Sequence, residues 1–278
     1  NSRGQTGHKS LKRQLSVPTQ VSSLPEPIKQ VASGSSKSLL LSETRKIYLL
    51  GYQYGSTTAH PVRLPLPYRE LYDDLEFTQV ALGDRYLAFL TDDNRVYTTG
   101  DNHFKELGRP VQQLGRPVQQ LGRPVVNEFD STPGQIDTPQ EPWVSIATGP
   151  THQILLTENG EAFSFGGSLK YPLCQESAKV EQPTEIKFDS PVNIIQVATG
   201  KWHSVFVTDE GRVYSCGKAE YKQHSHEETL VKTPKLVTGA IEGVRIIQAA
   251  VGEFHTVLLA DSGDVYTMGA GHDGQLGH

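Results

Sequence analysis

The sequence predicts an all-β protein built from repeats of a four-stranded antiparallel unit, the arrangement of a β-propeller. Five stretches share one template, in which a glycine, a short polar gap and an apolar run precede a tight turn and an aromatic-containing strand that ends in glycine. The leading glycine falls at positions 34, 83, 149, 200 and 252, which gives steps of 49, 66, 51 and 52 residues. Repetition at this period is typical of propellers, because about four short strands fit into one such unit.

Each copy has the pattern of antiparallel strands rather than of a helix. Its apolar residues form short runs rich in β-branched side chains, as in 203–207, without the three- and four-residue spacing of a helical stripe. The turn after this run has glycine in three copies and Asn94 in the second, where a hairpin loop requires a positive φ. Arg45 stands there in the first copy, and it predicts a frayed or capping unit.

Two further sets of positions recur. A glycine closes the aromatic strand and predicts a close approach of backbone where the strand leaves the sheet. A histidine follows the leading glycine by three residues in three copies, and Trp202 and Phe254 precede two of these histidines, which predicts packing between blades or at the rim. The structural positions of the repeat are therefore Gly34, Gly83, Gly149, Gly200 and Gly252, His152, His203 and His255, and Gly100, Gly166, Gly217 and Gly269.

The three equivalent histidines also raise the question of a metal site, because a propeller places equivalent residues in a ring. Three imidazoles with an open position are a plausible zinc constellation. The other copies have Lys37 and Tyr86 at this place, however, and equivalent atoms of adjacent blades lie too far apart for bonds of about 2 Å to one ion. We therefore expect the histidines to pack at strand starts and to hydrogen-bond loop backbone, and we predict no metal.

The sequence has no motif of an enzyme active site. A nucleophile elbow, a phosphate-binding loop and a dinucleotide fingerprint are all absent, so we predict no catalytic residue and no cofactor. His224 and His226 stand beside two glutamates, a pattern that predicts an exposed polar loop rather than a metal site. Cys216 occupies a strand position of the repeat and is predicted to be a buried thiol.

The recurring motif resembles the repeat of the regulator of chromosome condensation family. Gly-x-x-His-Ser/Thr precedes an apolar strand, a Thr-Asp/Glu-x-Gly turn and the strand Val-Tyr-x-x-Gly. Residues 273–277, Asp-Gly-Gln-Leu-Gly, match a second segment of that repeat, and 105–108 is a fainter copy of it. The resemblance covers residues 28–278 and implies blades of a propeller that typically has seven. Five copies therefore predict a fragment of a longer protein, which we favour, or an open ring.

Two segments lie outside the repeat pattern. Residues 1–27 are basic, rich in serine and poor in acid, and we expect a disordered tail, with a nuclear-targeting or nucleic-acid-binding arm and an organelle transit segment as alternatives. The heptad at 107–113 is duplicated at 114–120, which accounts for the one long step between copies. Its prolines and glycines exclude a coiled coil, so 107–140 is predicted to be an expanded loop between the second and third repeats.

Charge and hydropathy restrict the partners. Residues 1–30 carry a net charge of +4, which leaves −9 on the remainder of a chain whose formal charge is −5. Nucleic acid is an unfavourable partner for so acidic a body, since phosphate contacts need clustered lysine and arginine. No apolar run approaches the ~20 residues of a membrane span. We expect an intracellular protein, cytoplasmic or nuclear, with organelle targeting by the tail as an alternative.

For function, the resemblance implies a docking platform rather than an enzyme. Members of the family include the exchange factor for the small GTPase Ran and parts of ubiquitin ligases, kinases and membrane-traffic proteins. No segment matches exchange residues one by one. We predict a non-enzymatic scaffold for protein–protein interaction. The alternatives are a guanine-nucleotide exchange factor for a Ran- or Rab-like small GTPase and a structural subunit of a larger assembly.

Overall fold

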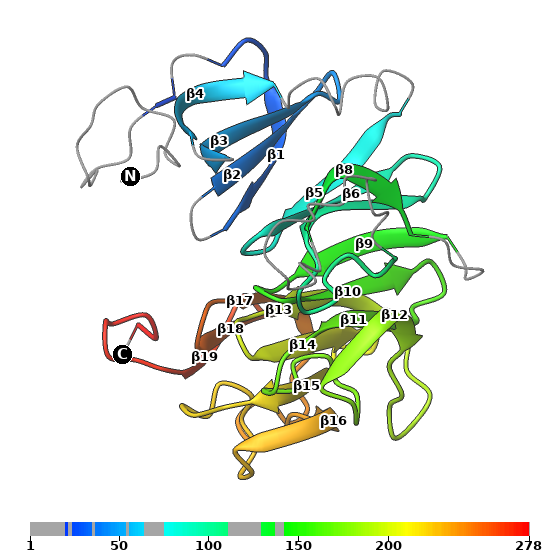
Figure 1. Cartoon of the computed structure of the whole chain (residues 1–278). Helices are drawn as coiled ribbons and strands as arrows, with labels where there is room; N and C mark the ends of the chain where they lie inside the picture. Colours follow the sequence, from blue (N-terminus) through cyan, green and yellow to red (C-terminus); the bar gives the residue numbers. More distant parts are fainter. Residues whose placement is uncertain are drawn as a thin grey trace.

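The computed structural model describes residues 20–21, 24–34, 37–53, 56–63, 75–110, 129–136 and 142–277. These residues form nineteen strands in five antiparallel sheets, and they contain no helix. The sheets follow one another along an arc, each with its strands in chain order (Figure 1). The predicted all-β propeller of antiparallel blades is thereby confirmed.

Four sheets have four strands and the fifth has three. The first two sheets contain β1 (Ile28–Ser33), β2 (Lys37–Ser42), β3 (Ile47–Gln53) and β4 (Ser56–Arg63), then β5 (Phe77–Leu82), β6 (Tyr86–Thr91), β7 (Val96–Asp101) and β8 (Phe129–Gln135). The next two contain β9 (Trp143–Thr148), β10 (His152–Thr157), β11 (Ala162–Gly167) and β12 (Lys179–Glu185), then β13 (Ile194–Thr199), β14 (His203–Thr208), β15 (Val213–Lys218) and β16 (Leu230–Leu236). The fifth contains β17 (Ile246–Val251), β18 (His255–Ala260) and β19 (Val265–Gly269).

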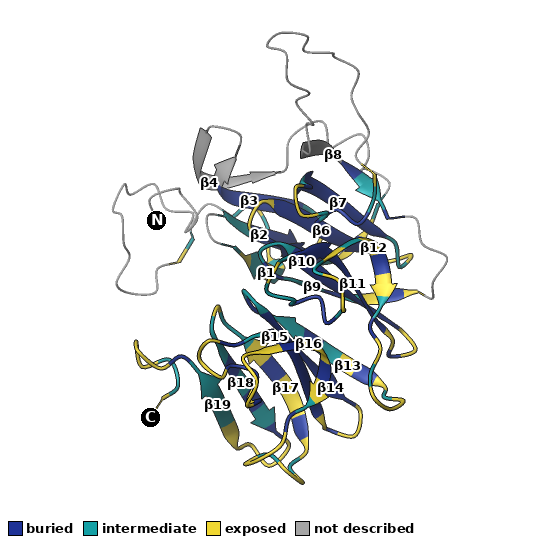
Figure 2. Ribbon diagram, turned by 60° about the horizontal axis from the view of Figure 1, so that its bottom comes forward, coloured by how far each residue is buried: buried dark blue, intermediate teal, exposed yellow. Residues whose placement is uncertain are grey.

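The hydrophobic core lies between consecutive sheets. Four of the core clusters each join one sheet to the next, as where Ile154 and Leu156 of β10 pack against Phe206 of β14. The first strand of each later sheet contacts the first and second strands of the sheet before it. Burial is therefore deepest in the middle of the arc, and the fifth sheet is visibly more exposed (Figure 2).

Two predicted boundaries differ from the structure. Strand β8 lies inside the segment 107–140 that we predicted to be a loop, and it supplies the outer strand of the second sheet. Residues of the predicted tail 1–27 also make contacts, because Leu24 packs on the first sheet and Glu26 accepts hydrogen bonds from Thr44 and Tyr48. The rest of the tail, except 20–21 and 24–27, and residues 111–128 and 137–141 of the loop lie outside the described residues.

The prediction of a free Cys216 thiol is wrong, because the structure joins Cys174 and Cys216 in a disulfide. Cys174 lies in the loop after β11 and Cys216 in β15, with their Cα atoms 5.4 Å apart. Both residues are buried, so the bridge links the third sheet to the fourth inside their shared core. A separation of 42 residues between two lone cysteines gave no spacing signal for this pair.

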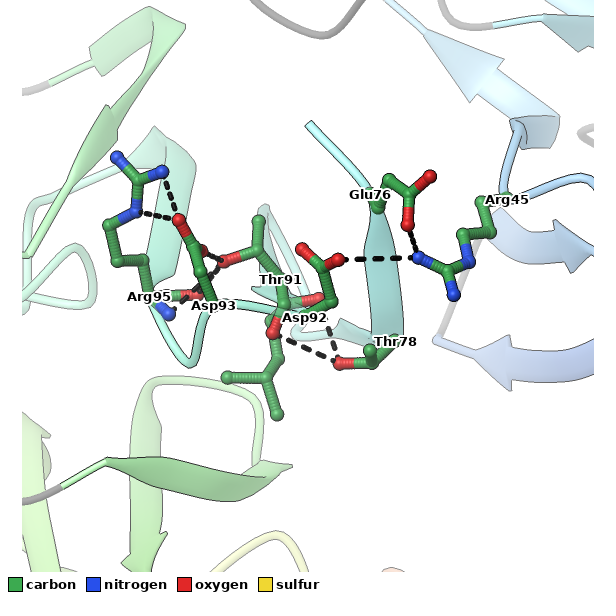
Figure 3. A network of polar contacts seen from close by, with 8 residues as sticks. Arg45, Glu76, Thr78, Thr91, Asp92, Asp93 and Arg95 are labelled. Atoms are coloured by element: carbon green, nitrogen blue, oxygen red, sulfur yellow. Dashed lines mark hydrogen bonds and ion pairs between the residues drawn. The ribbon is translucent and has the colours of Figure 1, made fainter. Parts of the chain in front are cut away.

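The first copy is not frayed at Arg45. Its φ of 62° matches that of Asn94, so the turn has the same left-handed conformation without glycine or asparagine. The guanidinium forms ion pairs with Glu76 and Asp92 of the second sheet (Figure 3). Arg45 thus connects the first sheet to the second, a role that Asn or Gly could not perform.

Candidate protein-docking face

The leading glycines make room for the ring three residues later. A Cβ atom on Gly200 would lie 2.5 Å from Cε1 of His203 and 2.7 Å from the Gly252 carbonyl oxygen. Gly149 and Gly252 are crowded in the same way by His152 and His255, and Gly83 by Tyr86. Gly34 differs, because the first copy has Lys37 in place of a ring, and its neighbours are Gly83 and Leu82. None of the five has a positive φ, so close packing alone requires glycine here.

His152 and His203 each join their own sheet to the next one through a hydroxyl. His152 Nε2 lies 3.3 Å from Ser204 Oγ, and His203 Nε2 lies 3.0 Å from Thr256 Oγ1. Each hydroxyl donates its own proton to a carbonyl oxygen, that of Pro172 for Ser204 and that of Gln223 for Thr256. The hydroxyl therefore accepts from the imidazole, which fixes the Nε2–H tautomer. His152 and His203 therefore bond to side chains of the next blade, where we had predicted bonds to loop backbone.

Burial keeps these imidazoles neutral. Desolvation lowers the pKa of both His152 and His203 to about 3, and neither Nδ1 atom has a hydrogen-bond partner among the described residues. An unpaired buried Nδ1 would have to be protonated to form the cation, which the apolar surroundings oppose. Tyr86, at the equivalent place in the second sheet, instead donates to a backbone carbonyl oxygen of the third sheet, that of Gly149 or His152.

The closing glycines are required for a different reason. Gly100, Gly166, Gly217 and Gly269 all have φ between 106° and 124°. Each faces the residue three after the leading glycine in the register of its sheet. A Cβ atom would overlap the carbonyl oxygen of the residue just before the second strand, for example that of Thr151 at 2.5 Å from a Cβ on Gly166.

Antiparallel connectivity places two kinds of loop on one face of the arc. The loop from first to second strand and the loop from third to fourth strand share an end of every complete sheet, and we call this end the loop face. In the second, third and fourth sheets the loop between the third and fourth strands contains non-glycine residues with a positive φ. They are Lys105, Tyr171, Cys174, Lys222 and Ser225. Gly274 and Gly277 hold the same places in the fifth sheet. The Asp-Gly-Gln-Leu-Gly segment is therefore a loop shape that the other copies adopt with different side chains.

These loops build an aromatic and cationic surface on the loop face. The rings of Trp202 and Phe254 lie 5.0 Å apart, and Tyr221 lies 5.6 Å from Phe254. Three ammonium groups surround the indole, at 5.2 Å for Lys170, 5.4 Å for Lys201 and 5.8 Å for Lys218. We call this surface the Trp202 patch, and it consists of Trp202, Tyr221, Phe254, Lys170, Lys201 and Lys218.

The charges of the patch are only partly balanced. Glu253 pairs with Lys201, and Glu220 pairs with Lys218 at 2.5 Å, which raises the pKa of Lys218. The Lys218 ammonium beside it lowers the pKa of Lys170. Leu169, next to Lys170, is 84% exposed. The patch therefore presents rings, one isolated apolar side chain and surplus positive charge on an otherwise acidic body.

The axis of the arc opens onto the same face. A cavity of about 520 Å³ is lined by the leading-glycine segments of all five sheets, including Asp84, Lys201 and Glu253. Its lining is mostly backbone and small residues, and it borders the Trp202 patch through Lys201 and Glu253. The cavity and the patch thus lie side by side among the described residues of the loop face. The described residues contain no cluster of histidine, cysteine, aspartate or glutamate fit for a metal ion.

His224 and His226 do not form the exposed loop that we predicted. Both are buried, His226 Nε2 lies 2.9 Å from Ser215 Oγ, and Ser215 can donate to the His224 carbonyl oxygen at 3.0 Å. Burial lowers the pKa of His224 to about 4. The burial of His224 could have been predicted by aligning this loop with the same loop of the other copies. In that alignment His224 takes the place of Leu107 and Leu276.

The sequence predicts Trp202 and Phe254 at the rim or between blades, but it has no signal for the rest of the Trp202 patch. Lys170, Lys218 and Tyr221 lie in loops whose side chains differ from copy to copy. Only the common loop shape brings them beside the indole. No helix that could span a bilayer occurs in the described part of the chain.

A family model for the RCC1-like domain matches residues 1–278, and the chain therefore belongs to the RCC1-like domain family. The E3 ubiquitin-protein ligase HERC2 of mouse is 28% identical over 95% of this chain, which spans 5% of that protein. The mouse RCC1-like G exchanging factor-like protein is 31% identical over 72% of this chain and 45% of its own length. The chain thus spans less than half of either relative.

Solved structures show the same fold. Human WBSCR16 has a TM-score of 0.74 and 25% identity, covering 88% of this chain and 62% of that chain. Yeast RCC1 (Prp20), solved with Kap60, has a TM-score of 0.70 and 22% identity, covering 87% of this chain and 56% of that chain. In both cases the match covers only part of the solved chain.

Proposed function

We propose that this chain is a protein-docking module, a non-enzymatic scaffold that binds a protein partner through the Trp202 patch. The observation that carries the proposal is the cluster of three half-buried or exposed rings on one face, with lysine ammonium groups over Trp202 and Phe254. Tryptophan, tyrosine and phenylalanine are enriched at the centres of protein interfaces, where their area is buried at low entropic cost. The loop backbone that holds them is anchored in the sheets.

Surplus lysine charge favours a partner segment that carries carboxylates beside an apolar or aromatic side chain. The apolar part would cover Trp202 and Leu169, and a carboxylate between Lys170 and Lys218 would relieve their mutual repulsion. Charge pairing at the rim of such a patch raises the association rate and is weakened by salt.

A second candidate is exchange activity on a small GTPase. It is favoured by the mouse RCC1-like G exchanging factor-like protein, which is 31% identical over 72% of this chain. In that case the loop face would bind the nucleotide-free GTPase more tightly than its nucleotide-bound forms, because an exchange factor stabilises the empty state. The third candidate function is that of a structural subunit of a larger assembly. Such a subunit would bind its neighbours through the same loop face, and bound nucleotide would not affect that binding.

The test is affinity capture from eukaryotic lysate with three baits: the wild type, the double variant Trp202→Ala/Phe254→Ala and the control Ile195→Ala. Ile195 is an exposed apolar residue of β13 away from the loop face. Partners lost with the double variant and kept with Ile195→Ala support docking through the patch. Equal capture by all three baits would exclude it. Parallel arms with GDP, a GTP analogue and no nucleotide distinguish an exchange factor from a scaffold.

A further inference from the structure

A disulfide ties the loop that carries Lys170 to the neighbouring sheet. Cys174 lies in the loop 168–178 between β11 and β12, and Cys216 lies in β15 of the fourth sheet. Lys170 stands four residues before Cys174, and its ammonium group lies 5.2 Å from the centre of the Trp202 ring. The bridge therefore fixes the segment that places one of the three lysines of the Trp202 patch.

Other sheets make the same contact without a covalent bond. Gly108 takes the place of the loop cysteine in the second sheet, where an added Cβ atom would lie 2.7 Å from Cδ2 of Phe165 in the third sheet. Ser225 takes that place in the fourth sheet and lines one cavity with Met268 of the fifth. Phe165 and Met268 stand just before the closing glycine, as Cys216 does. The fold therefore makes this contact by ordinary packing and does not require the bridge.

Non-covalent contacts also hold the loop 168–178. Leu173 is buried, the Pro172 carbonyl oxygen accepts from Ser204 Oγ at 2.6 Å, and the Gln175 amide donates to carbonyl oxygens of β12. The same Pro172 oxygen lies 3.8 Å from both sulfur atoms of the bridge, so a free thiol at either place would have an acceptor. We therefore expect the loop to shift, and not to unfold, when the bridge opens.

Opening the bridge must displace the loop, because the sulfur atoms have no spare room. A covalent bond holds them closer than the van der Waals contact of about 3.5–4 Å that two thiols require. Both cysteines are buried, with 1% and 0% of their surface exposed. Cys216 lies in a strand that is paired on both sides, with β14 and β16. The loop of Cys174 is therefore the part that moves, and Lys170 moves with it.

We propose that the Cys174–Cys216 bridge is a reversible redox switch of the Trp202 patch. The oxidised state holds Lys170 over the indole beside Lys218, which gives the patch its full positive charge. The reduced state lets Lys170 leave the indole, and the patch then attracts anions less strongly.

A dithiol reductant operates the switch by thiol–disulfide exchange. One thiolate of the dithiol bonds to Cys174 Sγ, and Cys216 leaves as a thiolate. The second thiolate of the dithiol then bonds to the first sulfur of the dithiol and releases Cys174. Each released cysteine takes up a proton that a reductant thiol gave up, so two electrons and two protons pass to the protein and the reductant becomes a disulfide.

Partner binding and the state of the bridge are linked in both directions. An acidic partner segment on the patch would hold Lys170 in its oxidised-state position. By reciprocity, the factor by which reduction weakens partner binding is the factor by which the partner makes the bridge harder to reduce. This consequence rests on the docking function proposed above, whereas the movement of Lys170 does not.

Iodide quenching of tryptophan fluorescence tests the switch without a partner. The chain has two tryptophans and Trp143 is buried, so the anionic quencher reports on Trp202 and the positive charge around it. The full chain is compared after oxidised glutathione and after dithiothreitol, with free thiols counted by alkylation and mass. The ratio of iodide to acrylamide quenching, which corrects for access, should be about twofold higher in the oxidised chain at an ionic strength of about 0.1 M.

Two variants serve as controls. Lys170→Gln removes the charge that moves, so reduction should leave its quenching ratio unchanged. Cys174→Ser/Cys216→Val cannot form the bridge, and serine already stands at the equivalent loop position of the fourth sheet. Dithiothreitol should not change the ratio of this double variant, which should stay close to that of the reduced wild type.

Equal quenching ratios in the oxidised and reduced wild type overturn the proposal. A bridge that resists excess dithiothreitol under native conditions overturns it too, as do cysteines that stay reduced in oxidised glutathione. Capture from lysate with oxidised and reduced bait adds the functional comparison, and we expect weaker capture by the reduced bait. A partner that needs Trp202 but binds both baits equally would leave docking intact and overturn its redox control. The iodide ratio decides whether Lys170 moves even when no partner is captured.

Discussion

At the residue scale, the repeat is defined by two glycines with different physical requirements. The leading glycine has an ordinary φ and is needed for the ring packed on it, whereas the closing glycine has a positive φ and also lies against backbone. The sequence shows both as invariants of the template without distinguishing their causes. The atoms packed around each glycine in the structure show which substitutions the leading and the closing position exclude.

Gly217→Ala and Gly263→Ala separate backbone strain from close approach. Both glycines have positive φ, 106° and 91°, but an added Cβ overlaps the Trp202 carbonyl oxygen at Gly217 and meets nothing within 4 Å at Gly263. We expect Gly263→Ala to lower the free energy of unfolding by about 1 kcal/mol and Gly217→Ala by about 3 kcal/mol or more. Urea unfolding measures both. Equal effects would show that the close approach contributes nothing.

The buried histidines predict loss of stability in mild acid. The pKa of His203 is about 3 in the folded state against an ordinary value of 6.5, so the unfolded state binds the proton more readily. Its contribution is complete above pH 6.5 and falls as the pH drops towards 3. Between pH 7 and pH 5 the wild type should lose about 2 kcal/mol through this residue.

The matched variant for the pH effect is His203→Gln, which keeps a donor for Thr256 and cannot titrate. Its unfolding free energy should fall less than that of the wild type between pH 7 and pH 5, by about 2 kcal/mol. Identical pH slopes in urea titrations would contradict the neutral, buried state of this ring.

At the scale of elements, contacts between sheets hold the arc together. Strand pairing within a sheet follows the template, so the strands and hairpins could be predicted from a period of about 52 residues. Three features could not be predicted from the repeat, because they depend on residues that are not repeated. Arg45 pairs with Glu76 and Asp92 beside the second sheet, and Cys174 meets Cys216 only in three dimensions. Strand β8 lies in a segment whose sequence is dominated by an expansion.

Gln196→Ala should be far more harmful than Gln248→Ala. The Gln196 side chain forms a two-bond clamp on the next sheet, because its amide donates to the Ala249 C=O and accepts from the Ala249 N–H. Gln196→Ala removes both bonds and leaves these backbone groups unpaired in a half-buried interface, at a cost of about 1–3 kcal/mol. Gln248→Ala removes an exposed side chain and should change stability by less than about 0.5 kcal/mol. Thermal unfolding at low micromolar concentration compares them. A Gln196→Ala variant as stable as Gln248→Ala would mean that the clamp is energetically neutral.

At the scale of the whole molecule, the loops of the loop face share one backbone shape in the second to fifth sheets but carry different side chains from copy to copy. The fold and the ring of equivalent positions were predictable from recurrence. The Trp202 patch was not, because its lysines and Tyr221 come from neighbouring blades and have no shared spacing. The patch depends on which side chains neighbouring loops carry, whereas the repeat template describes only what those loops have in common.

Hydrogen–deuterium exchange of the chain with and without a captured partner tests the central claim most directly. Docking through the Trp202 patch should slow exchange in loops 168–173, 200–203, 218–223 and 252–255 on the loop face. The turns at 158–160, 209–211 and 261–263, at the opposite ends of the same strands, should exchange at unchanged rates. Protection confined to these turns, with the loop face unaffected, would contradict the assignment of the patch as the docking site.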